Sequence, residues 1–186
     1  MRLHATAATR AALAAALCTA VSAPGATVTV DPSVEYQTML GFGGTGINGS
    51  VSDIVSDMGL SLHRAVVEPG GGAFPSFAIQ RQLRNLGVNT FIAVPWSPPA
   101  GMKDNSSTTN GGSLLPQYYT AFAQHLGRYV TDFKRDVGID LYAISPQNEP
   151  RFVEPYNSCV YTKEQYREVV ATVFSGSGLK ITLTDK

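Results

Sequence analysis

The chain has 186 residues, of which 44% are apolar and 15% are charged, a composition typical of a globular domain. Its 14 Lys and Arg residues balance 14 Asp and Glu residues, so the net charge is zero. Without a basic excess, neither nucleic acid nor an anionic membrane surface is an expected partner.

The first residues are predicted to form a secretory signal peptide over 1–23. Basic residues precede an apolar run at 11–20, and small residues follow at 21–23 in the pattern of a signal-peptidase site. The run is too short to span a bilayer, which takes about 20 apolar residues. Because Pro24 hinders cleavage after Ala23, the end of the peptide is placed between residues 20 and 26. An Ala-rich helix of the mature protein is the alternative.

Removal of this peptide leaves a mature domain over 24–186. The protein is therefore expected to be secreted. Cys18 leaves with the peptide, so Cys159 is the one cysteine that the mature sequence keeps.

Strand-like and helix-like segments alternate along the mature domain. A short leading strand is predicted at 28–31 and a second strand at 38–42, before a glycine-rich loop. Apolar strands, of the kind covered on both faces of a sheet, are predicted at 60–67, 90–95, 141–145 and 180–184. Helices are predicted at 77–86, 115–137 and 162–174 from helical spacing and end signals, including a capping box of Thr162 with Gln165.

This alternation predicts an α/β fold with a parallel sheet and right-handed crossovers. A (β/α)8 TIM barrel and a doubly wound open sheet both satisfy it. A closed barrel needs eight strands and about 250 residues, and five barrel strands fit before Lys186. The barrel interpretation is therefore of a truncated barrel that ends after about its fifth strand.

Residues 41–46, GFGGTG, match the G-x-G-x-x-G pattern of dinucleotide-binding domains, and Glu68 follows at about the distance of a ribose-binding acid. That site needs a helix to begin at the third glycine, and residues 47–50, INGS, open a helix poorly. A secreted protein also rarely meets NAD. A tight loop on the top face of a barrel is the preferred interpretation.

Residues 141–150, LYAISPQNEP, place Asn148 and Glu149 where an apolar strand stops. Chemistry in parallel barrels is done at the carboxyl ends of the strands. Glu149 is therefore predicted to be a general acid/base.

Two further residues are candidates for the same cleft. Trp96, the only tryptophan, follows a strand among prolines and is suited either to stacking on a sugar ring or to capping the core. Arg64 lies inside an apolar strand and needs a partner, either a carboxylate in the cleft or a salt bridge to a helix. His63 is predicted to be a packed residue.

These segments resemble glycoside hydrolase family 30. The resemblance rests on GFGG at 41–44, PWSPPA with MK at 95–103, AISPQNEP at 143–150 and YNSC at 156–159. The stretch 119–130 is most similar to the xylanase and glucuronoxylanase branches. The resemblance covers residues 28–186.

The resemblance implies a retaining glycosidase on a (β/α)8 barrel with a side β-domain, to which the leading strand at 28–31 would belong. It implies that Glu149 is the acid/base, that Asn148 holds the sugar 2-hydroxyl, that Arg64 steadies the nucleophile and that Trp96 lines the cleavage subsite. Retaining hydrolysis uses two carboxyl groups about 5–5.5 Å apart, and the acid needs a raised pKa.

The family nucleophile is a glutamate at the seventh strand, so it is expected to lie outside this chain. Glu68 is the other carboxylate at a predicted strand end and is a candidate for substrate binding. No metal or organic cofactor is implied, because the histidines lack ligand spacing.

The sequence thus predicts a secreted family-30-like hydrolase whose partner is a cell-wall polysaccharide, with xylan or glucuronoxylan as the first choice. A β-1,6-glucanase or a glucosylceramidase-like enzyme of the same family is the first alternative. A non-catalytic carbohydrate-binding relative is the second, and a dinucleotide-binding enzyme is the third. The isolated chain is expected to be inactive.

Overall fold

The computed structural model describes residues 29, 31, 33–34, 38–45, 50–70 and 77–176. The chain divides into two compact units, Met1–Thr38 and Met39–Lys186. In the first unit, Asp31 organises a turn in which its Oδ1 accepts hydrogen bonds from the backbone N (2.9 Å) and the Oγ (2.6 Å) of Ser33.

Three sequence predictions fall wholly or partly outside the described residues. Thr29 and Asp31 lie outside any strand, and the other two residues of the predicted strand at 28–31 are not described. The predicted signal peptide over 1–23 and the predicted strand at 180–184 lie outside the described residues altogether.

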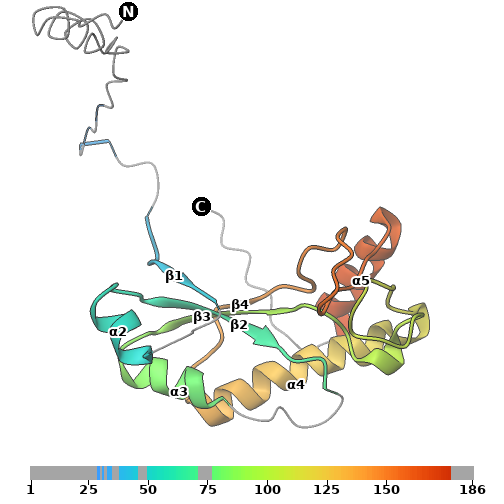
Figure 1. Ribbon diagram of the computed structural model, residues 1–186, viewed down its shortest axis with the longest axis horizontal. Helices are drawn as coiled ribbons and strands as arrows, with labels where there is room; N and C mark the ends of the chain where they lie inside the picture. The colour runs from blue at the N-terminus through green and yellow to red at the C-terminus, as the bar shows by residue number, and fades with distance from the viewer. Residues whose placement is uncertain are drawn as a thin grey trace, which may run out of the picture. The chain divides into compact units, whose positions relative to one another are not determined.

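The second unit is built on a parallel sheet, in which the described strands lie in chain order (Figure 1). The strands are β1 (Gly43–Gly44), β2 (Leu62–Val67), β3 (Thr90–Pro95) and β4 (Ala143–Ile144). A doubly wound sheet reverses its strand order at a switch point, whereas a barrel keeps neighbours in sequence as neighbours in space. The order β1-β2-β3-β4 therefore favours the barrel, and the predicted strands at 60–67, 90–95 and 141–145 are confirmed.

Helices connect these strands. They are α2 (Val51–Ser56), α3 (Ala78–Asn85), α4 (Tyr119–Val137) and α5 (Lys163–Gly176), with 3-10 turns η1 (Ala100–Met102) and η2 (Pro116–Tyr118). The predicted helices at 77–86, 115–137 and 162–174 are confirmed. The capping box at α5 is also confirmed, because Thr162 N donates to Gln165 Oε1 (2.9 Å) and Gln165 N donates to Thr162 Oγ1 (3.2 Å).

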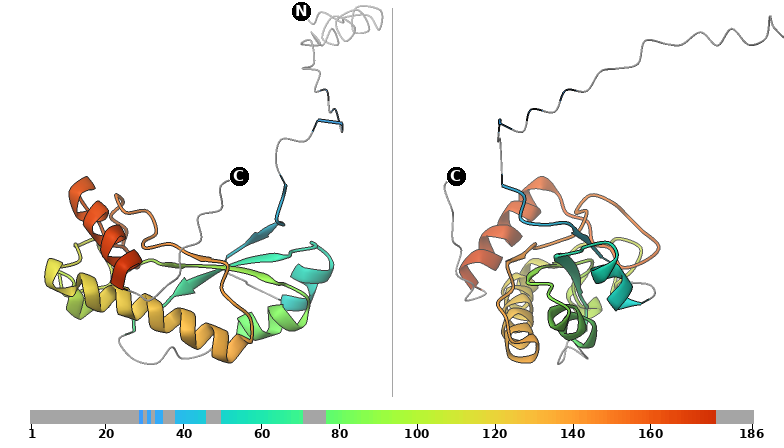
Figure 2. Two further views of the ribbon diagram at one scale, coloured as in Figure 1. Left: turned by 180° about the vertical axis from the view of Figure 1, so that it is seen from behind. Right: turned by 90° about the vertical axis from the view of Figure 1, so that its left-hand side faces the viewer.

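Helices α3 and α4 lie along one face of the sheet in each view (Figure 2). The core between them is aromatic: Phe133 of α4 packs on Phe91 of β3 (ring centroids 5.4 Å apart) and on Phe77 (5.5 Å). All three rings are buried. Apolar residues at helical spacing on α4 supply this face, as amphipathic patterning predicts.

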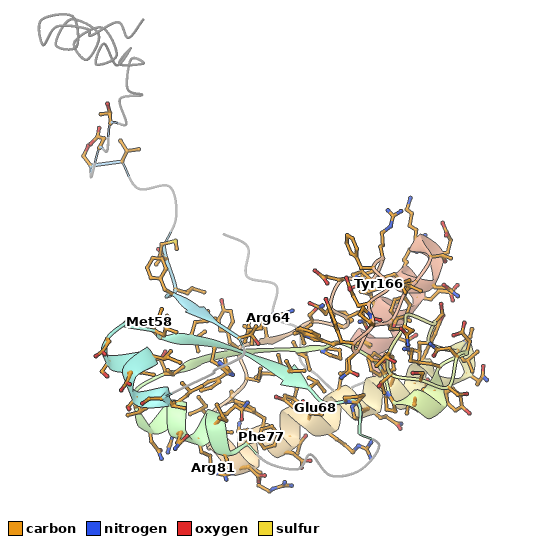
Figure 3. The ribbon with its side chains drawn as sticks, in the orientation of Figure 1. Met58, Arg64, Glu68, Phe77, Arg81 and Tyr166 are labelled. Carbon is orange, nitrogen blue, oxygen red and sulfur yellow. The ribbon has the colours of Figure 1, made fainter. Side chains whose placement is uncertain are left out.

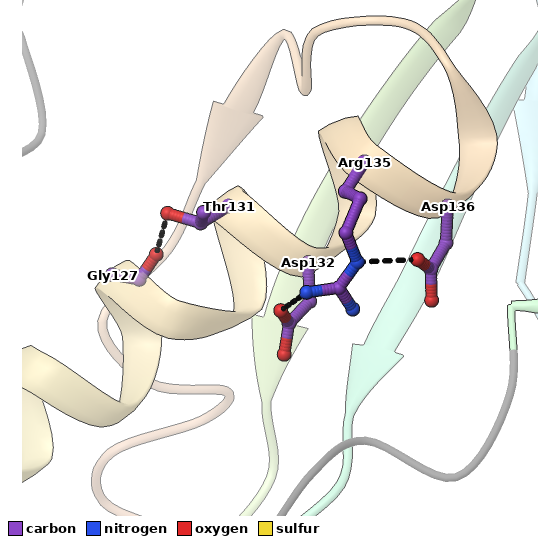
Figure 4. Close-up of polar contacts among 5 residues, drawn as sticks. All are labelled: Gly127, Thr131, Asp132, Arg135 and Asp136. Carbon is purple, nitrogen blue, oxygen red and sulfur yellow. Dashed lines mark hydrogen bonds and ion pairs between the residues drawn. The ribbon is translucent and has the colours of Figure 1, made fainter.

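The outer face of α4 is polar (Figure 4). Arg135 pairs with Asp132 (2.6 Å) and with Asp136 (2.8 Å), and Thr131 Oγ1 donates to the carbonyl of Gly127 (3.1 Å). Such exposed pairs contribute about 0–1 kcal/mol each, so the buried face of α4 decides its docking.

The predicted strand at 38–42 is wrong by a few residues, because the pairing falls on Gly43 and Gly44 instead. The Phe42 carbonyl accepts hydrogen bonds from the backbone N–H groups of Ser61 (3.0 Å) and Leu62 (3.1 Å). These bonds bring the segment before β1 against the segment that leads into β2. A Cβ on Gly43 would overlap the Leu62 carbonyl oxygen. Glycine therefore permits the close approach of β1 to β2.

Helix α2 is not predicted from the sequence. It has six residues, none of them buried, and it begins at Ser50, whose Oγ accepts from Asp53 N (3.4 Å). The expectation that the strand at 60–67 is covered on both faces is also wrong for β2 in the described residues. Burial alternates along it: His63, Ala65 and Val67 are buried, and the residues between them are half-exposed.

Candidate active site

A hollow of about 360 Å³ is lined by residues of β2, β3 and β4. Arg64, one of these residues, points away from the side of the sheet on which α3 and α4 lie (Figure 3). Arg64, Ile92 and Ala143 are partners in register across β2, β3 and β4, so their side chains point to the same face. The segment that follows β4 closes the hollow at the carboxyl end of the strands. The lining residues are Arg64, Ile92, Ala93, Val94, Ala143, Ile144, Ser145, Gln147, Asn148 and Glu149.

A chain of polar contacts leads across this hollow to Glu149. Arg64 Nη2 donates to Asn148 Oδ1 (2.6 Å), and Asn148 Nδ2 donates to Glu149 Oε2 (3.4 Å). Because the guanidinium occupies the amide oxygen, the amide N–H2 is turned toward the carboxylate. The carboxylate partner predicted for Arg64 is not present among the described residues, and neither is a salt bridge from Arg64 to a helix.

The backbone after β4 is fixed against the end of β3. Asn148 N donates to the Pro95 carbonyl (2.9 Å), and buried Gln147 donates through Nε2 to the Trp96 carbonyl (2.8 Å). These bonds set the position of Glu149, which has a φ of +41°. A left-handed conformation at a non-glycine residue costs about 1–3 kcal/mol and is concentrated at functional sites.

Trp96 lies half-buried beside this segment. Its ring packs against Tyr156, with centroids 5.5 Å apart and planes inclined by 51°. Its buried Nε1 has no hydrogen-bond partner among the described residues. Trp96 is packed against Tyr156 but remains partly accessible, so stacking on a sugar and capping of the core both stay predictions. Tyr156 belongs to the YNSC segment that carries the family resemblance, but the sequence assigned it no role in the site. It lies in the irregular segment after β4.

Glu68 lies apart from these residues. It follows β2 next to α4, whereas Arg64 points from the opposite face of the sheet (Figure 3). The Glu68 carbonyl lies 3.3 Å from His125 Nε2 of α4. Burial, with a smaller effect of the Glu68 charge, raises the pKa of Tyr129 on the same helix. The structure therefore does not bring Glu68 to Glu149.

His63 is a packed residue, as predicted. It is buried and meets the Phe91 ring edge-on at 6.0 Å. Burial lowers the pKa of His63, which favours the neutral imidazole. Within the described ranges there is no cluster of three or more His, Cys, Asp or Glu residues that could hold a metal ion. No helix in the same ranges is long and apolar enough to cross a membrane.

Chemically, the hollow presents one carboxyl group at the carboxyl ends of parallel strands, with an oriented amide beside it. Trp96 is joined to the lining through the bond of its carbonyl with Gln147. A carboxyl group so placed can give or take a proton. Hydrolysis with retention needs a second carboxyl group, and Glu149 is the one carboxylate among the described residues that line the hollow.

Comparison with known proteins gives concordant matches. The family model for the glycosyl hydrolase family 30 TIM-barrel domain matches residues 74–183. Glucuronoxylanase XynC of Bacillus subtilis (strain 168) is 31% identical over an alignment of 156 residues that covers 72% of this chain and 36% of that protein. The chain therefore spans about a third of the length of the curated relatives it matches.

Solved structures of other glycosidases also match this chain. The family 30 subfamily 8 xylanase Xyn30A from Clostridium acetobutylicum superposes with a TM-score of 0.67 at 30% identity, over 78% of this chain and 42% of that one. The endo-β1,6-glucanase BT3312 superposes with a TM-score of 0.62 at 26% identity, over 80% and 44%.

Proposed function

Because the chain belongs to glycosyl hydrolase family 30, we propose that it supplies the acid/base half of a retaining glycosidase that acts on xylan or glucuronoxylan. The observation that supports this most is the contact chain from Arg64 through Asn148 to Glu149 at the carboxyl ends of the strands. The proposed substrate follows the printed activities of the similar xylanases. A β-1,6-linked glucan is the second substrate, because one similar structure is a β-1,6-glucanase.

In the proposed reaction, Glu149 gives its proton to the glycosidic oxygen as the bond to the leaving sugar breaks. A nucleophilic carboxylate, which we place outside these 186 residues, forms a bond to the anomeric carbon. Water then attacks that carbon and gives a proton to Glu149. The bond between the carbon and the nucleophilic carboxylate breaks, and the sugar is released with retained configuration. Asn148 would hold the sugar 2-hydroxyl, a contact that strengthens in the transition state.

Arg64 has a more specific role in this proposal than steadying the nucleophile. Its bond to Asn148 Oδ1 orients the amide, so that Nδ2 is available to Glu149 and to the substrate. Trp96 would stack on the sugar at the cleavage point. Glu68 remains a predicted substrate-binding residue without support from its place beside α4. The proposal includes secretion through the signal peptide predicted at 1–23.

A hydrolysis assay of the protein at its natural length tests the proposal. Xylan, glucuronoxylan and β-1,6-glucan are supplied separately, and new reducing ends are counted. Removal of a positioned acid/base costs roughly 10²–10⁴-fold in rate, so Glu149→Gln should lose at least a hundredfold. Glu168→Gln, an exposed change on α5, should alter the rate by no more than about twofold. Equal activity in both variants would refute the assignment of Glu149.

The 186-residue chain alone should show no hydrolysis above its own Glu149→Gln variant. A second function, carbohydrate binding without cleavage, is favoured by the single carboxylate in the described hollow. Saturable binding of xylan at the natural length, weakened by Trp96→Ala and without new reducing ends, would support that function instead.

A further inference from the structure

Lys103 is buried, with 2% of its surface exposed, although it bears no ion pair among the described residues. Its Nζ donates to Ser97 Oγ (3.1 Å) and to the Ser158 carbonyl (2.6 Å). Burial lowers the pKa of Lys103, which reflects the cost of removing an ammonium group from water. A lysine is rarely kept in such a place without a specific task.

The two acceptors of Lys103 belong to different loops. Ser97 lies in the loop after β3, and Ser158 lies in the loop after β4. The same loops are joined by further bonds around Ser158: its Oγ accepts from Gly111 N (2.9 Å), and its N donates to the Thr108 carbonyl (2.9 Å). Thr109 also forms a bridge with residue 157. Gln147 and Ser158 are neutral buried side chains that bond across the two loops, and Lys103 adds a charged one.

Each loop bears one ring of an aromatic pair. Trp96 directly precedes Ser97, and Tyr156 lies two residues before Ser158. The Tyr156 ring is 46% exposed while it packs on Trp96. Partial burial raises the pKa of Tyr156, with further contributions from the charges of Glu154 and Glu149. The Trp96 backbone is joined to the segment of Glu149, because Gln147 Nε2 donates to the Trp96 carbonyl (2.8 Å).

We propose that Lys103 is a positioning residue that holds Trp96 against Tyr156, so that the two rings form one wall for a pyranose ring beside Glu149. The wall binds the apolar C–H face of a sugar, and Tyr156 is a second sugar-contacting residue in it. This inference rests on the proposed function for its ligand. The contacts of Lys103 and the pairing of the rings do not depend on that function.

Stability alone does not account for a buried ammonium group. The ammonium group is costly to remove from water, and its bonds to Ser97 Oγ and the Ser158 carbonyl offset that cost. Loss of the ammonium group leaves both buried acceptors without this donor, which lowers stability. A lysine that fixes two loops through directed bonds also stabilises one arrangement of those loops over others. The positioning role therefore predicts that loss of the ammonium group changes the surroundings of Trp96 as well as the stability of the fold.

The test is Lys103→Met in the 186-residue chain, with Lys134→Met as the matched control, because Lys134 is exposed on α4 and pairs with Asp140 at the surface. Trp96 is the only tryptophan of the chain, so its fluorescence reports on the wall directly. Emission maximum, acrylamide quenching, urea midpoint and binding of xylo-oligosaccharides are measured for both variants.

For Lys103→Met we expect a lowered urea midpoint, because two buried acceptors lose a donor. In the folded state we also expect emission at longer wavelength, stronger quenching and about tenfold weaker sugar binding. Lys134→Met should match the wild type in emission and binding. A lowered midpoint with wild-type emission in the folded state would overturn the proposal, because it indicates a purely structural lysine.

Two further outcomes are decisive. If Lys103→Met does not fold, Ser97→Ala, which removes only one acceptor, must shift the emission in the same direction, and wild-type emission there overturns the proposal. If the wild-type chain binds no sugar but Lys103→Met still shifts the emission of Trp96, the positioning of Trp96 by Lys103 is upheld. Sugar binding is then measured in the protein at its natural length, and no binding there would count against the proposed carbohydrate function instead.

Discussion

Phe133 joins helix α4 to the sheet, and its truncation is the sharpest test of the fold. The ring is fully buried and touches Phe91 of β3, Phe77 before α3 and, at 6.2 Å between centroids, Tyr129 one turn earlier. Phe133→Ala removes the central ring of this group. Because neighbours from three elements surround the site, we expect it to collapse only partly and to leave a cavity.

Truncation of a buried Phe to Ala costs about 3–5 kcal/mol, the sum of lost transfer free energy and the cavity. In a domain of this size each kcal/mol lowers Tm by about 2–4 °C, so the expected loss is about 6–20 °C. Thermal unfolding followed by far-UV circular dichroism measures it. Urea unfolding should give the same change in the free energy of unfolding.

Phe152→Ala is the matched control, because this Phe is 61% exposed in the loop after β4. It should change the free energy of unfolding by no more than about 0.5 kcal/mol. Similar losses in the two variants would refute the assignment of the core to the α4 face of the sheet.

Three further predictions follow from local geometry. Gly43→Ala should cost about 1–3 kcal/mol because a Cβ there overlaps the neighbouring strand, whereas Gly44→Ala, with no atom within 4 Å of its Cβ, should be tolerated in the same urea titration. Acidification from about pH 7 to 5.5 should lower the free energy of unfolding. Burial lowers the pKa of His63 below its usual 6.5, so the unfolded chain takes up the proton first as the pH falls. His63→Gln should therefore reduce the dependence of the free energy of unfolding on pH. Arg64→Met should lower the hydrolysis rate of the natural-length protein about tenfold or more by releasing Asn148, and wild-type activity would contradict the contact chain.

The repeated units of the fold could be predicted because each has a strong local pattern. Strand β3 has the predicted bounds, since an unbroken apolar run at 90–95 ends at prolines. Helix α4 ends at Val137 as predicted, because Gly138 adopts the left-handed conformation (φ +84°) that terminates helices. Both signals lie within a few residues of the element that they define.

Other features depend on tertiary structure. Strand β1 consists of two glycines, which are poor strand formers, so its pairing with β2 decides its conformation. Helix α2 buries no residue, and although Val51, Ile54 and Val55 have helical spacing, six residues are too few for that pattern to decide the structure. The bond between Arg64 and Asn148 joins residues 84 positions apart, so the sequence could indicate that Arg64 needs a partner without identifying it.

The candidate site, like the fold, could be predicted from the sequence only in part. Glu149, Asn148 and Trp96 were identified because they follow the ends of apolar strands, which a parallel sheet brings together. Glu68 also follows a strand end but turns toward α4, and the end of the strand alone does not fix that direction. Lys103 and Tyr156 lie in irregular loops, where burial and ring packing are decided by contacts between segments far apart in the sequence.

The measurement that tests the central claim most directly is azide rescue of Glu149→Gln in the protein at its natural length, with an aryl β-xylo-oligoside as substrate. An aryl leaving group departs without protonation, so the glycosyl-enzyme still forms, but its hydrolysis lacks a general base. Azide needs no base, so the account predicts restored turnover and a glycosyl azide of retained β configuration. Unimpaired hydrolysis without azide, or slow hydrolysis that azide does not accelerate, would contradict the assignment of Glu149 as the acid/base.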